Sequence, residues 1–381
     1  MFYESEYGIL PNRYMPSRHM FPDGIFYDFS LKYCASCGTV VNLNDNSDSA
    51  MFDGYVYRTP ETLESLESVE TLCSSIVGAV DVSKIDILEI GGNTGFYLNS
   101  LIRELENKGV SCNAVLIDKI EPSVMSGCFH WINDFLTNES LVEHDLESKF
   151  DLVIARHCMA HNADAVSLFS NIIKTVAPNG LIYVELTDLE RIFESKNFGQ
   201  FYPEHRYSFS KSSIKTLCRI FNLQLVATVN LFIHGGSVGY FIRPLSISNK
   251  RGSTVTREST ESKVTSSAMY DLHNNWLLSG FDVVKQYKKQ KDVILWGCSA
   301  KAVYALNQFA YGRVDFFDFI WDNTPEKNFL FPPGFNVPVN AESTKDFCAN
   351  VVLGAPNFSQ LTSRITAEGH SIIGEFDRCY E

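Results

Sequence analysis

Short apolar runs alternate with longer helix-like stretches over residues 61–186. The apolar runs lie at 85–90, 113–118, 151–155 and 181–186, and the helix-like stretches lie near 61–79, 94–108 and 163–177. Strands that alternate with helices along a chain form parallel βαβ units. This part of the sequence therefore predicts an α/β domain built on a parallel sheet.

Two further strand candidates follow closely, at Leu223–Phe232 and Ser237–Ile242. The short connection between them predicts an antiparallel pair, because parallel strands need a long crossover. We expect this pair to close one edge of the sheet.

The pattern then restarts after a polar, poorly periodic stretch at 245–268, which indicates a linker. A helix-like stretch at 269–290 precedes strand candidates at 293–296, 317–322 and 351–354, so a second, smaller Rossmann-like unit is expected. Residues 1–60 are rich in Tyr, Phe, Pro and Asp and show little periodicity, which is typical of a small loop-rich module. The predicted domains are 1–60, 61–245 and 246–381.

Composition narrows the class of protein. The 381 residues carry a formal net charge of −13, and this argues against binding nucleic acid through its phosphates. We find no long apolar run and no basic, apolar start typical of a secretion signal, so neither a membrane nor export is expected. The ten cysteines are scattered, which favours a reduced, cytoplasmic protein. A monomer is the default expectation.

A glycine-rich turn follows the apolar run 85–90 and opens a helix-like stretch. Such a turn brings backbone close to a nucleotide-like ligand and presents the free N–H groups of the next helix. The E-x-G-x-x-x-G spacing, with its carboxylate before the first glycine, resembles motif I of the S-adenosylmethionine (SAM) methyltransferases. The expected SAM-binding residues here are Glu89, Gly91, Gly92, Asn93, Gly95 and Phe96.

Acidic residues that follow the next strands are candidates for binding the ribose and adenine of such a ligand. Asp118 or Glu121 is placed to accept the ribose hydroxyls. Asp134 and Phe135 could hold the adenine amino group and ring. A solvated acid at a strand end is the competing interpretation for each carboxylate.

Two groups of residues could carry proton chemistry. His157 and His161 come just past the strand candidate 151–155, and Tyr202, Glu204 and His205 lie within four residues of one another after 181–186. An imidazole can take a proton near neutral pH, a phenol can donate to an oxyanion, and a carboxylate can orient the imidazole. An aromatic surface loop is the competing interpretation.

Several ordered blocks of this chain resemble the nucleotide-sugar C-methyltransferases of deoxysugar biosynthesis. They are Cys34-Ala-Ser-Cys37-Gly38, Asp53-Gly-Tyr55-Val-Tyr57, Glu89 to Phe96, Ala160-His161, Tyr202-Pro-Glu204-His205 with Tyr207-Ser-Phe-Ser, His234-Gly-Gly-Ser237, Gly297-Cys-Ser-Ala-Lys301 and Trp321 to Lys327. The resemblance implies a class I SAM-methyltransferase domain with a C-terminal unit that helps to hold the nucleotide part of a 4-keto-6-deoxy sugar.

The resemblance also implies roles for single residues. His205 would remove the C3 proton of the keto sugar, and Tyr202 and His161 would stabilise the enolate oxygen. Tyr57 would reach the same pocket, and Glu204 would tune or position His205 or bind a sugar hydroxyl. No metal is needed for this step.

The chain departs from the family pattern in two places. Cys34 and Cys37 match only the second of two zinc-binding C-x-x-C pairs, and a half site cannot close a tetrahedral zinc site, so zinc is doubtful. His19 is a candidate third ligand. Cys298 and Ala302 stand where the family has glycine-like or small residues, which puts the bound nucleotide in question.

Two other functions stay open on the sequence. An O- or N-methyltransferase acting on another small metabolite would use the same SAM domain without a carbon acid. The third possibility is a non-catalytic binding or scaffold protein, which the incomplete zinc pair and the altered C-terminal turn would also fit.

Overall fold

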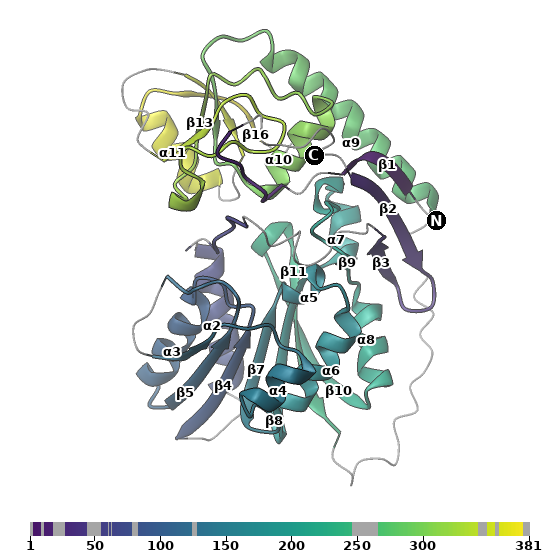
Figure 1. Cartoon of the computed structure of the whole chain (residues 1–381), viewed down its shortest axis with the longest axis vertical. Helices are drawn as coiled ribbons and strands as arrows, with labels where there is room; N and C mark the ends of the chain where they lie inside the picture. The colour runs from purple at the N-terminus through teal and green to yellow at the C-terminus, as the bar shows by residue number, and fades with distance from the viewer. Residues whose placement is uncertain are drawn as a thin grey trace.

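The computed structural model describes residues 3–8, 11–17, 27–43, 55–59, 61, 63–77, 83–123, 128–245, 266–341, 349–354 and 358–375. Three sheets organise the chain (Figure 1): a large sheet in the middle of the sequence, a smaller one in the C-terminal third, and a four-stranded one that includes the N-terminal strands. None of the described helices is long and apolar enough to cross a membrane.

The large sheet has seven strands in the order β10-β11-β8-β7-β4-β5-β6. Strands β4, β5, β6, β7 and β8 run parallel, whereas β11 pairs antiparallel with both β8 and β10. This is the class I SAM-methyltransferase fold, and the predicted antiparallel pair at one edge is confirmed. The strand bounds are Lys84–Ile90 (β4), Ser111–Ile117 (β5), His130–Ile132 (β6), Phe150–Arg156 (β7), Val176–Thr187 (β8), Leu223–Leu231 (β10) and Ser237–Pro244 (β11).

Helices cover both faces of this sheet (Figure 1). They are α2 (Leu63–Val77), α3 (Phe96–Asn107), α4 (Asn138–Glu143), α5 (Cys158–His161), α6 (Ala165–Thr175), α7 (Leu189–Glu194) and α8 (Lys211–Ile220). Local caps fix several starts: Asp164 accepts the N–H groups of Val166 and Ser167, and Ser210 forms a capping box with Ser213. Most residues of β4 and β7 are buried, on both sides of each strand, because helices pack on both faces of the sheet.

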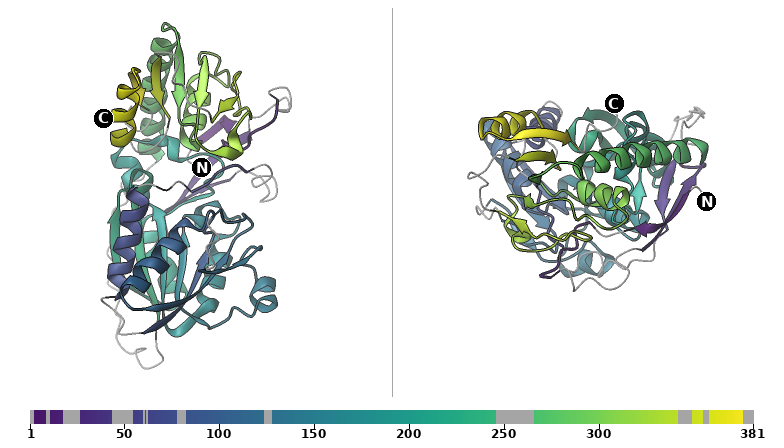
Figure 2. Two further views of the ribbon diagram at one scale, coloured as in Figure 1. Left: turned by 90° about the vertical axis from the view of Figure 1, so that its left-hand side faces the viewer. Right: turned by 90° about the horizontal axis from the view of Figure 1, so that it is seen from above.

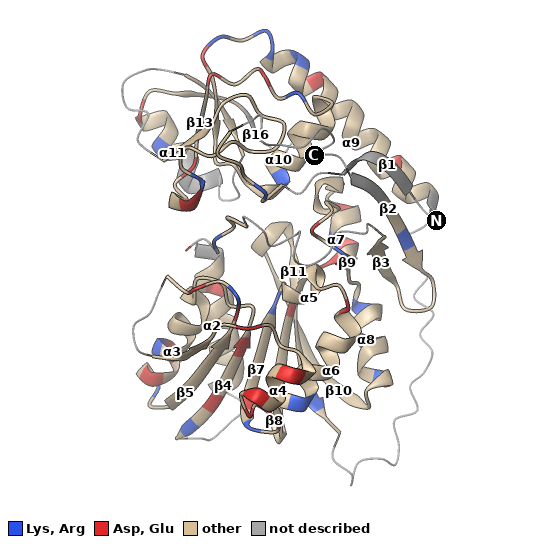
Figure 3. Cartoon of the chain, in the orientation of Figure 1, with Lys and Arg blue, Asp and Glu red and all other residues tan. Residues whose placement is uncertain are grey.

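The C-terminal unit is a second parallel sheet, in the order β14-β13-β12-β15-β16. Its elements are α9 (Ser266–Tyr287), β12 (Val293–Trp296), α10 (Ala300–Phe309), β13 (Phe319–Trp321), β14 (Val339–Asn340), β15 (Asn350–Leu353), α11 (Phe358–Ala367) and β16 (Ser371–Glu375). The predicted linker at 245–268 falls mostly outside the described residues, and its last residues already belong to α9. Acidic and basic residues intermingle over both α/β units (Figure 3).

The N-terminal module is richer in strands than its weak periodicity indicated. Strands β1 (Tyr3–Gly8), β2 (Tyr27–Cys34) and β3 (Thr39–Asn42) form an antiparallel sheet. Its fourth strand, β9 (Tyr207–Ser208), comes from the methyltransferase part of the chain and pairs with β3. The loop that carries Tyr202 and His205 is therefore anchored to this module.

One apolar core joins the C-terminal unit to the rest of the protein. Trp276 of α9 lies in it, with its ring 5.4 Å from the ring of Phe198 and 4.5 Å from that of Phe309. Phe198 belongs to the short turn η2 (Phe198–Gln200), just before the Tyr202–His205 loop. Side views show the C-terminal unit stacked on one end of the large sheet (Figure 2). The position of the loop thus depends on this packing.

Trp276→Ala should lower the free energy of unfolding by about 3–5 kcal/mol, because a fully buried indole is lost from the core that joins the units. Urea unfolding followed by circular dichroism measures the change. Leu278→Ala is the matched control in the same helix, because Leu278 is 64% exposed and should stay within about 0.5 kcal/mol of the wild type. Equal losses in the two variants would contradict this account of the packing.

Candidate active site

The glycine turn after β4 can be formed only with small residues. Gly91 and Gly95 have φ values of 69° and 73°, in the left-handed region that favours glycine. A Cβ on Gly92 would lie 2.6 Å from Leu116 Cδ1 and 2.7 Å from Glu89 Oε2. Helix α3 begins at Phe96 without a side-chain cap. In its first turn, the N–H of Phe96 donates to Thr94 Oγ1 at 3.4 Å and the backbone of Leu98 hydrogen-bonds to the Glu89 carboxylate, so a ligand at this end of α3 would share the helix N-terminus with protein acceptors.

Glu89 places a buried carboxylate beside the turn. The residue is 1% exposed, and its Oε2 has no hydrogen-bond partner among the described residues. Burial raises the pKa of its carboxyl to about 7, even though Arg156 acts in the opposite direction. A buried acceptor without a donor suits a cationic ligand. These residues therefore fit SAM, which carries an ammonium and a sulfonium group, and Glu89, Gly91, Gly92, Gly95 and the start of α3 would hold it.

Asn93 and Asp118 close the turn from the next strand. Asp118 Oδ2 accepts the backbone N–H of Asn93 at 2.8 Å, and its Oδ1 accepts that of Ile120 at 2.8 Å. The Asn93 side chain binds the backbone of Tyr57 and Thr59, at 3.2 Å and 3.0 Å. Of the two residues predicted to bind the ribose, Asp118 is thus fixed beside the turn, whereas Glu121 is exposed.

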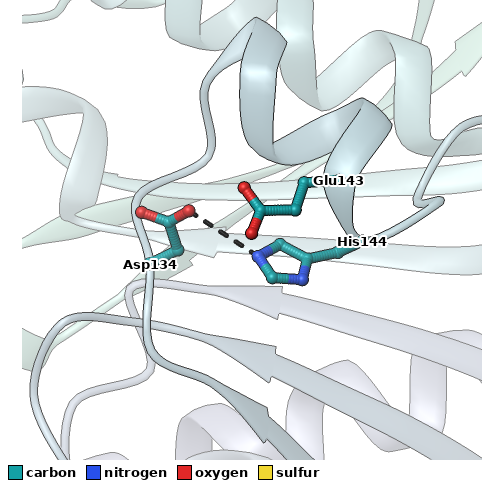
Figure 4. A group of neighbouring side chains, drawn as sticks. All are labelled: Asp134, Glu143 and His144. Atoms are coloured by element: carbon teal, nitrogen blue, oxygen red, sulfur yellow. Dashed lines mark ion pairs between the residues drawn. The ribbon is translucent and has the colours of Figure 1, made fainter.

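Asp134 and Phe135 lie on an open surface after β6. Asp134 already pairs with Lys119 at 3.3 Å and with His144 at 3.6 Å, and Phe135 is 42% exposed. Asp134, Glu143 and His144 are also the one group in the described part of the chain whose ligand atoms could hold a metal ion (Figure 4). Their role toward adenine stays a prediction.

Tyr202, His205 and His161 lie next to one another in the structure. His205 Nε2 lies 2.8 Å from the Tyr202 hydroxyl, and its Nδ1 lies 2.7 Å from the carbonyl oxygen of Gln200. A carbonyl can only accept, so Nδ1 carries the hydrogen and Nε2 of the neutral ring must accept from Tyr202. The hydrogen bonds thus leave His205 Nε2 as a base.

His161 is arranged in the same way. Its Nδ1 lies 2.8 Å from the backbone carbonyl of Glu204, and its ring centroid is 4.8 Å from that of His205. Burial lowers the pKa of His161 to about 4 and that of His205 well below its usual range. Both rings are therefore neutral bases near pH 7. His161 can stabilise an enolate oxygen only after it has taken up a proton.

The carboxylate of Glu204 points away from both imidazoles. It accepts the backbone N–H of Asn12 at 2.8 Å and the Asn12 side-chain amide at 2.5 Å. Tyr57 is half-buried, and its phenol interacts electrostatically with Tyr202 and Arg156. The five predicted catalytic residues therefore gather in one region, and among them Glu204 contacts His161 through its backbone carbonyl.

A charged network beside this site went unnoticed in the sequence. Glu185 is fully buried in β8, 3.2 Å from Arg156 Nη2 and 3.0 Å from His157 Nε2, and it also accepts from Ser68 and Tyr183. The ring of His157 lies edge-on to that of His234, 4.5 Å between centroids. An acid inside an apolar strand was the available signal, because an unpaired charge is rarely buried.

The two candidate zinc ligands hydrogen-bond within their own turn. Cys34 Sγ lies 3.0 Å from Ser36 Oγ, and Cys37 Sγ lies 3.2 Å from Thr39 Oγ1. Both are free thiols, and hydrogen bonds from Ser36 and Cys37 lower the pKa of Cys34 to about 7. No described residue completes a zinc site with them, and His19 lies outside the described residues.

The C-terminal turn after β12 is occupied by the protein's own side chains. The N–H of Cys298 donates to Asp322 Oδ2 at 2.7 Å, and Lys327 Nζ donates to both Asp322 and the Cys298 carbonyl. Lys301, at the start of α10, acts electrostatically on His205 and His234. Its positive charge thus favours the neutral form of both imidazoles.

Comparison with known proteins agrees with this geometry. The family described as "Methyltransferase domain" matches residues 67–228. This part of the chain is a SAM-dependent methyltransferase domain. C-methyltransferase NovU from Streptomyces niveus is 24% identical over 220 residues, which cover 55% of this chain and 50% of NovU. The match thus spans about half the length of that curated relative.

Solved structures with a similar arrangement are more distant. The SAH-bound magnesium protoporphyrin IX methyltransferase from Synechocystis PCC 6803 is 14% identical, with a TM-score of 0.38 over 52% of this chain and 95% of its own. A Burkholderia thailandensis 1,6-didemethyltoxoflavin-N1-methyltransferase is 13% identical, with a TM-score of 0.36 over 48% of this chain and 79% of its own.

Gly91→Ala should weaken binding of S-adenosylhomocysteine, measured by titration calorimetry, by about tenfold or more, because its Cβ would lie 2.8 Å from Cys158 Cβ and displace the turn. Gly109→Ala is the matched control. Gly109 also has a positive φ, but nothing lies within 4 Å of its added Cβ. Unchanged affinity in Gly91→Ala would mean that the ligand does not use this turn.

Glu185→Gln should cost about 3–5 kcal/mol in the free energy of unfolding, because it leaves the Arg156 guanidinium buried without its counter-charge. Arg156 and His157 hold the pKa of Glu185 below its usual range against the effect of burial, so the loss should shrink as the pH falls below the ordinary carboxyl pKa. Urea unfolding at several pH values tests this. The exposed pair of Glu194 with Arg191 is the control, since Glu194→Gln should cost less than about 1 kcal/mol.

Proposed function

We propose that the protein is a SAM-dependent C-methyltransferase that methylates C3 of a nucleotide-linked 4-keto-6-deoxy sugar. The observation that carries this proposal is the pair of neutral imidazoles, His205 and His161, with the Tyr202 hydroxyl between the methyltransferase domain and the C-terminal unit. A carbon acid needs such a base, whereas an oxygen or nitrogen acceptor is already nucleophilic. The partial match to a C-methyltransferase supports the same choice.

The chemistry follows from the hydrogen-bond pattern. The C4 ketone acidifies the hydrogen on C3, and His205 Nε2 takes that proton. The Tyr202 hydroxyl, released from Nε2 when the ring becomes protonated, donates to the enolate oxygen. His161 lies beside His205, with 4.8 Å between the ring centroids, and is a second neutral imidazole near the reacting carbon. SAM, when bound, would supply a methyl group attached to a cationic sulfur. C3 would form a carbon–carbon bond to that methyl group as the bond between the methyl group and the sulfur breaks.

The C-terminal unit would hold the nucleotide part of the substrate. Lys301 is a cation directed at the imidazole cluster from the start of α10, and a diphosphate is the substrate group that it suits. The Gly297–Ser299 turn itself is filled by Asp322 and Lys327. Phosphate recognition would therefore rest on Lys301 more than on the turn.

An O- or N-methyltransferase acting on another small metabolite is the alternative. It would use the same SAM turn, but its acceptor would not need the buried imidazole pair to remove a proton from carbon. Exchange of a carbon-bound hydrogen separates the two functions, because only C-methylation passes through an enolate.

His205→Ala should lower the exchange of the C3 hydrogen in D2O by about 100-fold or more, because the general base is lost. The assay follows the C3 proton by NMR with dTDP-, GDP- or CDP-4-keto-6-deoxy sugars, in the absence of SAM. His130→Ala is the control, since His130 is exposed at the amino end of β6. Full exchange in His205→Ala would remove that residue from the base role, and methylation by the wild type without any exchange would favour the alternative.

A further inference from the structure

A short N-terminal segment, residues 11–15, connects the two α/β units. Arg13 pairs with Tyr55, and Met15 pairs with Phe331 of the C-terminal unit through backbone hydrogen bonds of 3.2 Å and 2.8 Å. The Tyr14 hydroxyl donates to the carbonyl of Cys298 at 3.0 Å. This purple segment lies on the side of the C-terminal unit that faces the methyltransferase domain (Figure 1).

Asn12 of the same segment contacts the active-site loop directly. Its backbone N–H donates to Glu204 Oε1 and its side-chain amide donates to Oε2, so each carboxylate oxygen receives one donor. Asn12 is 3% exposed and Glu204 1% exposed. Two donors from one residue fix both the position and the plane of the carboxylate, and solvent does not compete.

The two ends of Glu204 serve different partners. Its carboxylate faces Asn12, while its backbone carbonyl accepts the Nδ1 hydrogen of His161. Tyr202 and His205 lie within two residues on either side. A displacement of the carboxylate would therefore move the carbonyl that orients His161, together with the adjoining backbone of His205.

We propose that Asn12 is a positioning residue, which grips the Glu204 carboxylate and thereby sets the loop that carries Tyr202 and His205. This inference rests on the proposed function, because it assigns the loop a catalytic task. It gives the N-terminal segment a part in the active site that does not involve zinc.

The charge of Glu204 makes the proposal measurable. Burial raises the pKa of Glu204 to about 7, and the two Asn12 donors oppose that rise because they favour the ionised form. The titratable groups that face Glu204 are the phenols of Tyr14, Tyr55 and Tyr202, and burial raises the pKa of each above its usual value. The phenols are neutral near pH 7, and so is His161, whose ring is bound to the Glu204 carbonyl and whose pKa burial lowers to about 4. Within this group of side chains, Glu204 is therefore the one that titrates near pH 7.

Asn12→Ala removes one of the two donors, and Asn12→Gln keeps an amide on a longer side chain. Tyr14→Phe is the matched control, since it removes a buried hydrogen bond of the same segment that ends on Cys298. We expect the pKa of Glu204 to rise by about one unit in Asn12→Ala, since a lost bond to a charged group costs at least that much. Tyr14→Phe should change the pKa of Glu204 much less, because the neutral Tyr14 hydroxyl donates to Cys298 and not to Glu204. Asn12→Gln should return the pKa of Glu204 part of the way to the wild-type value.

The experiment titrates the wild type and the three variants, labelled with ¹³C at the glutamate carboxyl, by NMR, with Glu204→Gln to assign the signal. The same variants are then assayed for C3 exchange across pH. Asn12→Ala should lose exchange about tenfold or more, with its acid limb shifted to higher pH and its affinity for S-adenosylhomocysteine retained. An unshifted Glu204 signal, or equal losses in Asn12→Ala and Tyr14→Phe, would overturn the proposal. A shifted signal in a protein whose wild type shows no exchange would instead overturn the proposed function.

Discussion

Two backbone carbonyls determine the chemistry that this site can perform. Gln200 and Glu204 each accept the Nδ1 hydrogen of an imidazole, so His205 and His161 both present a lone pair at Nε2. Burial then keeps both rings neutral, since a charged ring would lose hydration that nothing nearby replaces. Because the carbonyls belong to one short loop, every contact that holds the loop also sets the tautomers. The packing of α9, the pairing of β9 with β3 and the hydrogen bonds from Asn12 all hold this loop in place.

The elements of the two α/β units could be read from the sequence because their determinants are local. Apolar runs bounded by turns predicted six of the seven strands of the large sheet and three of the five strands of the C-terminal sheet, whereas β6, β14 and β16 were missed. The E-x-G-x-x-x-G pattern correctly predicted a glycine turn after β4, and the binding of SAM by its residues stays a prediction. The N-terminal strands were missed although Tyr27–Cys34 alternates strictly between apolar and polar residues. The two-residue strand that completes their sheet, β9, lies about 165 residues further along the chain and has no pattern of its own.

Contacts within the site were harder to predict for the same reason. Tyr202, Glu204 and His205 are neighbours in sequence, yet the carboxylate of Glu204 is bound to a residue 192 positions away. A local reading therefore paired that carboxylate with the adjacent imidazole. Glu185 lay inside a strand that was read as core, and only the fold brings Arg156 and His157 to it. Charge pairing between separate strands leaves no short motif, whereas a glycine turn does.

The sharing of β9 between two parts of the chain has a consequence for biosynthesis. Strands β1, β2 and β3 leave the ribosome before the methyltransferase sheet, but β9, the partner of β3, is synthesised only after most of that sheet. Until then β3 has an unpaired edge, which is a surface open to wrong pairing with other chains. The N-terminal sheet is thus translated before the large sheet but is completed only after most of it. Because β9 begins two residues after His205, the strand that completes the N-terminal sheet also anchors the loop that carries Tyr202 and His205.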